Sequence, residues 1–355
     1  MDVVSDAISA VRVGRPSSSR LRVSGDWAVR LAPYEGVGFH VVLAGACTLL
    51  PDDGGAPVPL GAGDVVLVSH GTGHVLADAA AGPGAARRAR LLTDVPETDL
   101  VLPGAGPEVR LLCGKYRLDR SRTHPLLAEL PELVHLPYGD TGSPELRSAV
   151  GLLAGELDAD GGRPGASLVL PGLLDLLLVY MIRAWAARAG TGGWPAALAD
   201  PATAAALHAL HCAPATPWTN DLLAARAGVS RATLARRFST LVGRPPMAYL
   251  TWWRLTLAAT RLRATDAPLA TVARETGYGS PYALSHAFSR EFGITPGRYR
   301  SLGAPPAGAS RHEAEAVTEK VSSATSKYSR ASRTLPTGAD THTSYSRPAS
   351  SQHRS

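Results

Sequence analysis

The chain contains few cysteines and no long uncharged apolar run. Only three cysteines, Cys47, Cys113 and Cys212, occur in 355 residues. With so few thiols and no signal-peptide pattern, we expect a reduced protein of the cytoplasm rather than a disulfide-rich secreted one. No stretch of about eighteen residues is apolar and free of charge, so we expect no transmembrane helix and no membrane partner.

Lysine is absent from the segment Trp218–Ser301, and acidic residues are scarce there. Twelve arginines against four acidic residues give this segment a charge of +8, whereas the whole chain carries +6. The rest of the chain is therefore slightly acidic. A basic surplus confined to one segment indicates contact with phosphates, and this favours nucleic acid as the partner.

The same segment contains one pattern twice. Residues of matching type recur 49 positions later before a turn and 50 positions later after it, because the second turn has one more residue. The matched pairs are Ala224/Ala273, Gly228/Gly277, Ser230/Ser280, Leu234/Leu284, Phe238/Phe288, Gly243/Gly293, Pro246/Pro296 and Tyr249/Tyr299. These matched positions, in the same order, indicate an internal duplication.

Each copy has the residues of a helix-turn-helix unit. Gly228 can adopt the positive φ that a tight turn needs, and the Ser230 hydroxyl can cap the next helix. Leu234 and Phe238 are four residues apart, so they share one helical face, which we expect to be buried. In the second copy, Pro281 suits the first position of the corresponding helix. Two such units predict a module that reads duplex DNA; a helical bundle without a DNA role is the alternative.

The opposite face of each second helix is left for DNA. By periodicity it presents Ala232, Ala235, Arg236 and Ser239 in the first copy, and Tyr282, Ser285, His286 and Ser289 in the second. Arg236 can contact guanine O6 and N7 with two hydrogen bonds, and alanine can contact a thymine methyl group. Between the copies, Met247–Arg263 is predicted to form one helix that holds them about one duplex turn apart.

At these residues the stretch Trp218–Arg300 resembles the DNA-binding domain of AraC/XylS-type transcription regulators, most closely over "GYGSPYALSHAFSREFGITPGRYR". The resemblance implies seven helices, with a long helix joining two helix-turn-helix units. His286 departs from the arginine that many members carry there, which favours a positional role for the second copy. The predicted DNA-binding residues are Ser230, Arg231, Ala232, Ala235, Arg236, Ser280, Pro281, Tyr282, Ala283, Ser285, His286 and Arg290.

The N-terminal part has a different pattern. From Leu21 to Arg117 short apolar runs alternate with turns rich in Gly, Pro and Asp, which is typical of antiparallel strands in a barrel or sandwich. The predicted strands are Trp27–Leu31, Phe39–Leu43, Cys47–Leu50, Asp64–Val68, Val75–Ala77 and Val109–Cys113. "LGAGDVVLVSHGTGH" (Leu60–His74) resembles the second cupin motif, and Gly38–Leu49 resembles a degenerate first motif. The resemblance implies a cupin-like sensor domain.

Three histidines and two cysteines are the candidate site residues of this domain. Metal-binding cupins carry His-x-His and a Glu in the first motif, but here Val42 stands two residues after His40. His40, His70 and His74 are therefore candidates for effector contact, with a metal ion as the alternative. No other cofactor is expected. Cys47 and Cys113 are candidates for a thiol sensor, with a purely apolar, buried role as the alternative.

Helical segments follow. Pro144–Leu157 and Leu168–Ala189 are predicted helices, and the second is too apolar for a lone surface helix. We expect it to pack on the β-strands, on a second subunit in a homodimer, or on both. Gly190–Trp194 is predicted to be a flexible joint, and Ala202–Cys212 to form the first helix of the DNA-binding part.

We therefore predict an α+β multidomain chain. Its parts are a cupin-like antiparallel β-barrel (1–140, the β-domain), a helical linker and dimerisation region (141–195), an all-α domain with both helix-turn-helix units (196–302, the helical domain) and a disordered tail (303–355). The tail has almost no large apolar groups with which to form a core.

The predicted function is a ligand-responsive transcription regulator rather than an enzyme. The predicted partners are double-stranded DNA, an unidentified small-molecule effector and RNA polymerase. Two alternatives belong to other classes. One is a cupin oxygenase or isomerase with a DNA-binding appendage, which the incomplete metal motif disfavours. The other is an architectural protein that binds any duplex with equal affinity.

Overall fold

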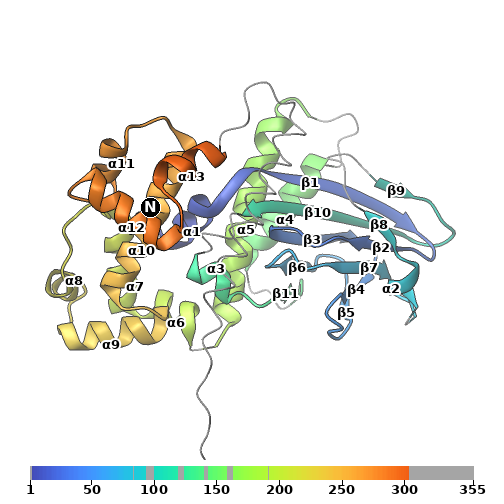
Figure 1. Ribbon diagram of the computed structural model, residues 1–355. Coiled ribbons are helices and arrows are strands. Elements are labelled where there is room, and N and C mark those ends of the chain that lie inside the picture. The colour runs from blue at the N-terminus through green and yellow to red at the C-terminus, as the bar shows by residue number, and fades with distance from the viewer. Residues whose placement is uncertain are drawn as a thin grey trace, which may run out of the picture.

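The computed structural model describes residues 2–82, 84–92, 100–118, 124–139, 143–157, 163–190 and 192–303. In Figure 1 the strands gather on one side of the molecule and the helices of the C-terminal part on the other. The predicted succession of a β-rich part and an all-helical part is confirmed. The predicted disordered tail was 303–355. Its first residue, Gly303, ends the last described helix, and the rest of the tail lies outside the described residues.

The β-domain consists of two sheets. Their strands are β1 (Arg12–Ser24), β2 (Ala28–Leu31), β3 (Gly36–Ala44), β4 (Cys47–Pro51), β5 (Val58–Leu60), β6 (Val65–Val68), β7 (His74–Asp78), β8 (Arg90–Leu92), β9 (Leu100–Leu102), β10 (Glu108–Leu118) and β11 (Leu133–Leu136). The six-stranded sheet has the order β11-β6-β3-β10-β1-β9, and the five-stranded sheet the order β5-β4-β7-β2-β8. The pairing is antiparallel, as predicted, except that β9 and β8 lie parallel to β1 and β2.

Successive side chains along a strand point to opposite faces of the sheet, so the strands contribute to two apolar layers. On β10, Leu111 and Cys113 point between the sheets, where they meet Leu49 of the opposite sheet. Leu112 and Tyr116 of the same strand point the other way, into a core shared with helices. The six-stranded sheet is thus buried on both faces. The two facing sheets form a sandwich, one of the two arrangements that the punctuated apolar runs predict.

Strand β1 was not among the predicted strands. Its residues, "RVGRPSSSRLRVS", are mostly arginines and serines, so no apolar run marks a strand before Leu21. Pairing with β10 holds this segment extended, in a register that runs from Ser17 opposite Lys115 to Ser24 opposite Glu108. Tertiary pairing therefore overrides a weak local signal.

Helices cover the outer face of the six-stranded sheet. They are α1 (Val3–Val11), α3 (Pro125–Glu129), α4 (Pro144–Leu157) and α5 (Ala166–Arg188), and the single turn α2 (Ala85–Arg88) lies beside the other sheet. The predicted helices Pro144–Leu157 and Leu168–Ala189 correspond to α4 and α5, whereas α1 was not predicted. In Figure 1 α1, α3 and α5 lie between the sheets and the C-terminal helices.

We expected no helix with the length and composition of a transmembrane helix, and α5 differs from this expectation. Among the described helices, α5 is the one that is long and apolar enough to cross a membrane, by length and composition only. Of its most apolar stretch of 18 residues, 28% is buried. Asp175, in the middle of α5, pairs with Arg12 of β1, and the Leu174 carbonyl accepts a hydrogen bond from Tyr116. These contacts tie α5 to the six-stranded sheet.

The helical domain follows. Its helices are α6 (Gly193–Ala199), α7 (Pro201–Cys212), α8 (Asn220–Arg226), α9 (Arg231–Val242), α10 (Pro246–Ala264), α11 (Leu269–Glu275), α12 (Pro281–Phe292) and α13 (Pro296–Gly303). The predictions for Ala202–Cys212 and Met247–Arg263 are confirmed by α7 and α10. We refer to α8, α9 and the start of α10 as the first copy, and to α11, α12 and α13 as the second copy.

The predicted flexible joint Gly190–Trp194 is wrong in its second half. α6 begins at Gly193, and the Trp194 side chain is 1% exposed. The backbone N–H of Trp194 donates to the Glu129 carboxylate of α3 over 2.9 Å, and the Trp194 ring packs edge-on against His124. Burial of a large indole outweighs the loop tendency of the neighbouring glycines.

One apolar core joins the β-domain to the first copy. It runs from Val37 and Leu67 on the sheet, through Leu178 of α5, to Leu234 and Trp253. The second copy has a core of its own around Leu284 and Phe288. α10 contributes its first half to the shared core and its second half to the separate one.

Candidate DNA-binding surface and β-domain site

The first copy has the predicted turn and cap. Gly228 lies in the turn between α8 and α9 with a φ of +68°, a conformation that favours glycine. Ser230 is the N-cap of α9, and its Oγ accepts from the Thr233 N–H over 3.2 Å. Leu234 and Phe238 are buried, with exposures of 1% and 0%. The opposite face of α9 is therefore free to meet a ligand.

The second copy repeats this geometry. Gly277 has a φ of +78°, and Ser280 caps α12 by accepting from the Ala283 N–H over 3.1 Å. Leu284 and Phe288 are completely buried. A side chain at Gly277 would also meet the Cα atom of Ala215 at 2.8 Å. Glycine is therefore required at this turn by both backbone conformation and space.

None of the predicted DNA-binding residues is buried. Exposed are Ser230, Arg231, Ala232, Arg236, Pro281, Tyr282, Ala283, His286 and Arg290, and half-buried are Ala235, Ser280 and Ser285. The helical period thus predicted the two faces correctly. α12 carries on this face a depression of about 440 Å³, which is lined by Tyr282, Ser285, His286, Ser289 and Arg290.

Ion pairs distinguish the arginines of this surface. Arg237 donates to Asp200 at the N-terminus of α7 over 3.2 Å. Arg231 lies 3.6 Å from Asp221. Arg236 and Arg290 have no hydrogen-bond or ion-pair partner within the described ranges, and both are exposed. Their guanidinium groups are therefore available to an external acceptor.

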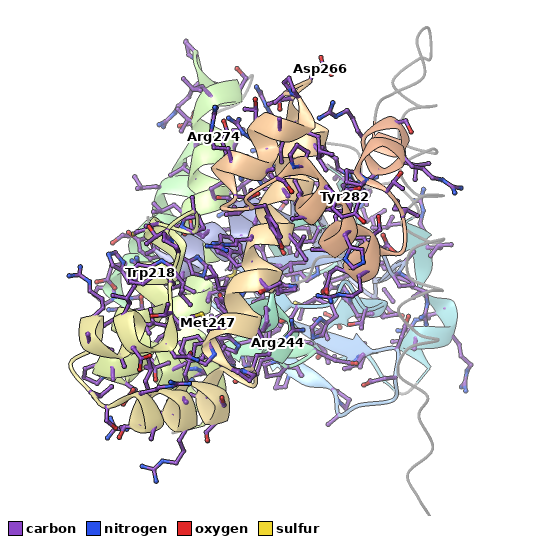
Figure 2. All side chains as sticks on the ribbon, turned by 60° about the vertical axis from the view of Figure 1, so that its left-hand side comes forward. Trp218, Arg244, Met247, Asp266, Arg274 and Tyr282 are labelled. Carbon is purple, nitrogen blue, oxygen red and sulfur yellow. The ribbon has the colours of Figure 1, made fainter. Side chains whose placement is uncertain are left out.

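α10 fixes the distance between the two copies. Figure 2 shows Met247 and Arg244 at one end of this helix and Asp266 beyond its other end, with Tyr282 on the second copy. In the middle of α10, Arg254 donates to the carbonyl oxygens of Pro214 and Thr216, each over 2.7 Å. The loop before the first copy is thus tied to the helix that carries the second.

In the β-domain the structure brings together two of the three candidate histidines. His40 of β3 and His74 of β7 lie with their Nε2 atoms 2.7 Å apart, and His40 Nδ1 lies 3.0 Å from the Cys113 sulfur. His70 is not part of this cluster, because its Nε2 contacts the Leu130 carbonyl at 2.8 Å. Within the described residues, no group of three or more His, Cys, Asp or Glu side chains is arranged to hold a metal ion.

The hydrogen-bond partners determine which ring nitrogen of each histidine carries the hydrogen in this cluster. The Thr72 carbonyl can only accept, so His74 Nδ1, 2.9 Å away, carries a hydrogen. For neutral rings, His74 Nε2 then accepts from His40, and His40 Nδ1 accepts from the Cys113 thiol. Burial lowers the pKa of His40 well below its ordinary value, with a further contribution from His74, and burial also lowers the pKa of His74. Both rings are therefore neutral.

The two candidate thiols face one interior. Cys47 and Cys113 come from opposite sheets and share the core between them, both as free thiols. Burial raises the pKa of each to about 12. Both are therefore protonated at neutral pH, and Cys113 acts as a hydrogen-bond donor to His40. This arrangement favours the apolar, structural interpretation of these residues over a reactive pair.

Known proteins match both parts of the chain. Residues 2–187 match the family described as Cupin, and residues 223–301 match the family described as Helix-turn-helix domain. A putative AraC-like transcription regulator of Streptomyces antibioticus is 37% identical over 306 residues, which cover 84% of this chain and 98% of that protein. The HTH-type transcriptional regulator AlkR of Acinetobacter baylyi is 28% identical over 306 residues, or 84% and 99% of the two chains.

A solved DNA-binding domain is similar to part of this chain. The DNA-binding domain of AdpA in complex with a target DNA is 35% identical and covers 29% of this chain and 91% of that one, with a TM-score of 0.27. The cupin match and the 37% identical relative span the β-domain, the helical linker and the DNA-binding part. This chain belongs to the AraC-type transcription regulators, with an N-terminal cupin domain and a C-terminal pair of helix-turn-helix units.

Proposed function

We propose that this regulator reads two successive major-groove segments with α9 and α12, and that Arg236 is its principal base contact. The observation that carries the proposal is the pair of neighbouring arginines on α9. Arg237 is held by Asp200, whereas Arg236 is exposed and has no partner within the described ranges. An unpaired guanidinium on a recognition helix can donate two parallel hydrogen bonds to guanine, and such a pair contributes about 1–3 kcal/mol of discrimination.

Selection of bound duplexes from a random library tests this role. Wild type is expected to enrich a bipartite motif about one helical turn long at two salt concentrations. Arg236→Ala should weaken the base preference in one half of that motif and leave the other half unchanged. Arg237→Ala is the matched control, because it removes the same charge from the same helix without removing a proposed base contact. No enriched motif, with binding that only fades as salt rises, would support the architectural alternative instead.

The second copy is proposed to read DNA with a different chemistry. Tyr282, 81% exposed, and His286 offer one donor each, and Ser285 offers a hydroxyl. None can make the two-bond contact of an arginine with guanine, so we expect weaker discrimination at this half-site. Arg290, at the end of the same face, is proposed to contact phosphate.

The β-domain is proposed to bind the effector, and RNA polymerase is proposed as a further partner on the basis of family membership. His40 and His74 remain the candidate contacts, and His70 lies apart from them. An effector can change DNA binding only by its different affinity for two arrangements of the chain. A metal ion at the histidine cluster would need the His40 ring to give up one of its two present contacts.

A homodimer is proposed to form through α4 and α5. Leu152, Leu168 and Leu176 are 60%, 82% and 37% exposed on this pair of helices. A groove of about 390 Å³ lies between the helices, and its lining includes Leu152, Leu176 and Tyr180. Apolar patches of this kind on a soluble chain mark interaction surfaces, and a second copy related by a two-fold axis would cover one patch with the other.

Sedimentation at micromolar concentration tests the homodimer. Wild type should sediment as a dimer, and Leu152→Glu should give monomers because it places a charge in the apolar patch. Leu222→Glu is the control, since Leu222 is 53% exposed but lies on α8, outside the patch. A monomeric wild type would contradict the proposal.

A further inference from the structure

The first copy is fixed to the β-domain, whereas the second copy depends on its connection to the first. The first copy shares a core with the sheets, and across this junction Asp6 of α1 lies 3.0 Å from His211 Nδ1 of α7. The second copy packs around a core of its own, and α10 contributes to both cores. The angle between the two copies therefore depends on α10 and on any further contact that bridges them.

A second bridge begins at the loop of residues 213–219, which leads from α7 to α8. The loop is folded on itself, because the Ala213 carbonyl accepts from the Thr216 N–H over 3.1 Å and from the Trp218 indole N–H over 2.9 Å. Its last residue, Thr219, is the N-cap of α8. A movement of this loop is therefore passed directly to the start of the first copy.

Arg254, in the middle of α10, holds this loop. Its Nε and Nη2 atoms donate to the carbonyl oxygens of Pro214 and Thr216, each over 2.7 Å. The side chain is half-buried, and its planar fork suits two acceptors that lie two residues apart. Hydrogen bonds from a charged donor are also stronger than those between neutral groups. α10 is thereby joined to the first copy through this loop as well as through the shared core.

The same guanidinium lies against the turn of the second copy. A methyl group on Gly277, between α11 and α12, would lie 2.9 Å from both Cζ and Nη2 of Arg254 and 2.8 Å from the Cα atom of Ala215. Only glycine leaves room for this approach. In Figure 1 the loop passes beside the second copy before it reaches α8. Arg254 is therefore in contact with the loop of the first copy and with the turn of the second.

Gly228, the matched glycine of the first copy, has no such neighbour. Its φ of +68° is close to the +78° of Gly277, but a methyl group there would meet no described atom within 4 Å. Both turns thus use glycine for the same backbone conformation, and the second also uses it for close packing. The contact at Gly277 is therefore a property of the bridge between the copies and is not required by the helix-turn-helix itself.

We propose that Arg254 is a positioning residue that fixes the angle between α9 and α12, and thereby the spacing of the two half-sites that the regulator prefers. This inference rests on the proposed reading of two successive major-groove segments. In this role Arg254 contacts neither base nor phosphate. It holds the loop of the first copy against the turn of the second, so that the two recognition helices keep one relative orientation.

The geometry of the duplex makes this angle important. About 10–10.5 base pairs complete one turn, so one inserted base pair rotates the second half-site by about 34–36° relative to the first. Two recognition helices at a fixed angle cannot follow that rotation, and they lose contacts at one half-site. Helices that are free to change their angle follow it at lower cost. Arg254 therefore contributes the preference for one spacing over its neighbours.

Distances between spin labels on the two copies, measured by double electron–electron resonance on the full chain, test the angle without DNA. The labels are placed at Thr240→Cys of α9 and Ala283→Cys of α12, which are exposed positions. The background is Cys212→Ser, in which the two remaining thiols are buried. With Arg254 present we expect one narrow distance distribution. Arg254→Met keeps the apolar stem but removes the donors, so it should broaden the distribution about twofold or more.

Matched variants separate this role from a general loss of stability. Arg254→Lys keeps the charge but replaces the planar fork with one ammonium group, so its distribution should be intermediate in width. Arg261→Met removes another arginine of α10, which pairs with Glu275 over 2.9 Å, and it should leave the distribution unchanged. Gly277→Ala should broaden the distribution, whereas Gly228→Ala, with the same backbone strain, should retain the original width.

The spacing preference provides the second measurement. The probes are the bipartite duplex that the wild type selects and two versions with one base pair inserted or removed between the half-sites. The wild type should bind the altered duplexes about tenfold more weakly, a loss similar to that for one mismatched base pair. Arg254→Met should reduce this ratio to about threefold or less, because its two copies can adjust to the altered spacing.

The two measurements distinguish this inference from the reading proposal. If the wild type selects no bipartite duplex, the reading proposal fails, and the distance distributions still decide whether Arg254 fixes the angle. An unbroadened distribution in Arg254→Met would overturn the inference. Equal broadening in Arg261→Met, or an unchanged spacing ratio in Arg254→Met, would overturn it as well.

Discussion

Tyr249 and Tyr299 occupy the same position in the two copies, yet they lie in different cores. Tyr249 is buried in the core that the first copy shares with the sheets, and Tyr299 is buried in the core of the second copy. The Tyr299 ring lies under the guanidinium of Arg263, 4.5 Å from its centroid, whereas the Tyr249 hydroxyl meets two histidines. The duplication therefore retained the residue type while its surroundings diverged, and the first copy became the one attached to the β-domain.

Truncation of the two matched phenylalanines should separate these cores. Phe238→Ala and Phe288→Ala each remove a fully buried ring, at an expected cost of about 3–5 kcal/mol. Phe238→Ala should destabilise the β-domain together with the first copy, because they share one core. Phe288→Ala should unfold the second copy locally. Calorimetry with site-resolved hydrogen exchange checks this, and identical exchange patterns in the two variants would contradict it.

The two N-caps should contribute equally to stability. Ser230→Ala and Ser280→Ala each remove the hydroxyl that accepts the first free amide of α9 or α12, so each should cost about 1 kcal/mol. Ser239→Ala makes the same chemical change within α9 but removes no cap, and it should stay within about 0.5 kcal/mol of wild type. Urea unfolding of the three variants provides the comparison, and a Ser239→Ala effect as large as the cap effects would refute the assignment.

The three thiols should differ strongly in reactivity. Cys212 is exposed, whereas Cys47 and Cys113 are buried and have a pKa raised to about 12. At pH 8 only about one in ten thousand of the buried thiols would be ionised, and the thiolate is the reactive form. Iodoacetamide followed by peptide mass spectrometry should therefore label Cys212 alone in the folded chain. Rapid labelling or oxidation of Cys113 would restore the thiol-sensor hypothesis.

The sequence was most informative where a signal repeats locally. Gly228, Ser230 and Leu234 recur at fixed spacing, so turn, cap and buried face could all be predicted for both copies. β1 escaped prediction because its serines and arginines are held by pairing with β10 rather than by their own propensity.

The candidate residues of the β-domain and the junction show a second limit of prediction from a single sequence. His40 and His74 could be nominated from a motif, but their contact with Cys113 depends on the register between β3 and β10. Asp6 and His211 are 205 positions apart, and neither belongs to a motif. Such contacts are determined by how distant elements pack, and a single sequence has no local pattern that reports them.

Buried neutral histidines should make stability depend on pH. Burial lowers the folded-state pKa of His40, His74 and His124 below the unfolded value of about 6.5, so the unfolded chain binds protons that the folded chain excludes. Their contribution is therefore fully present above about pH 6.5 and is lost progressively as the pH falls below it. Each such histidine adds a slope of up to about 1.4 kcal/mol per pH unit between pH 6.5 and its folded pKa.

The variant His40→Asn isolates the contribution of His40 to the pH dependence of the free energy of unfolding. Because the variant lacks a titrating ring at this position, its free energy of unfolding should fall less steeply between pH 6.5 and pH 5 than that of wild type. The difference in slope should approach the value for one proton, whatever the variant's stability at neutral pH. Urea unfolding at several pH values measures both slopes. Equal slopes would mean that His40 takes up its proton over the same pH range in the folded and unfolded chains, which would contradict a pKa lowered by burial.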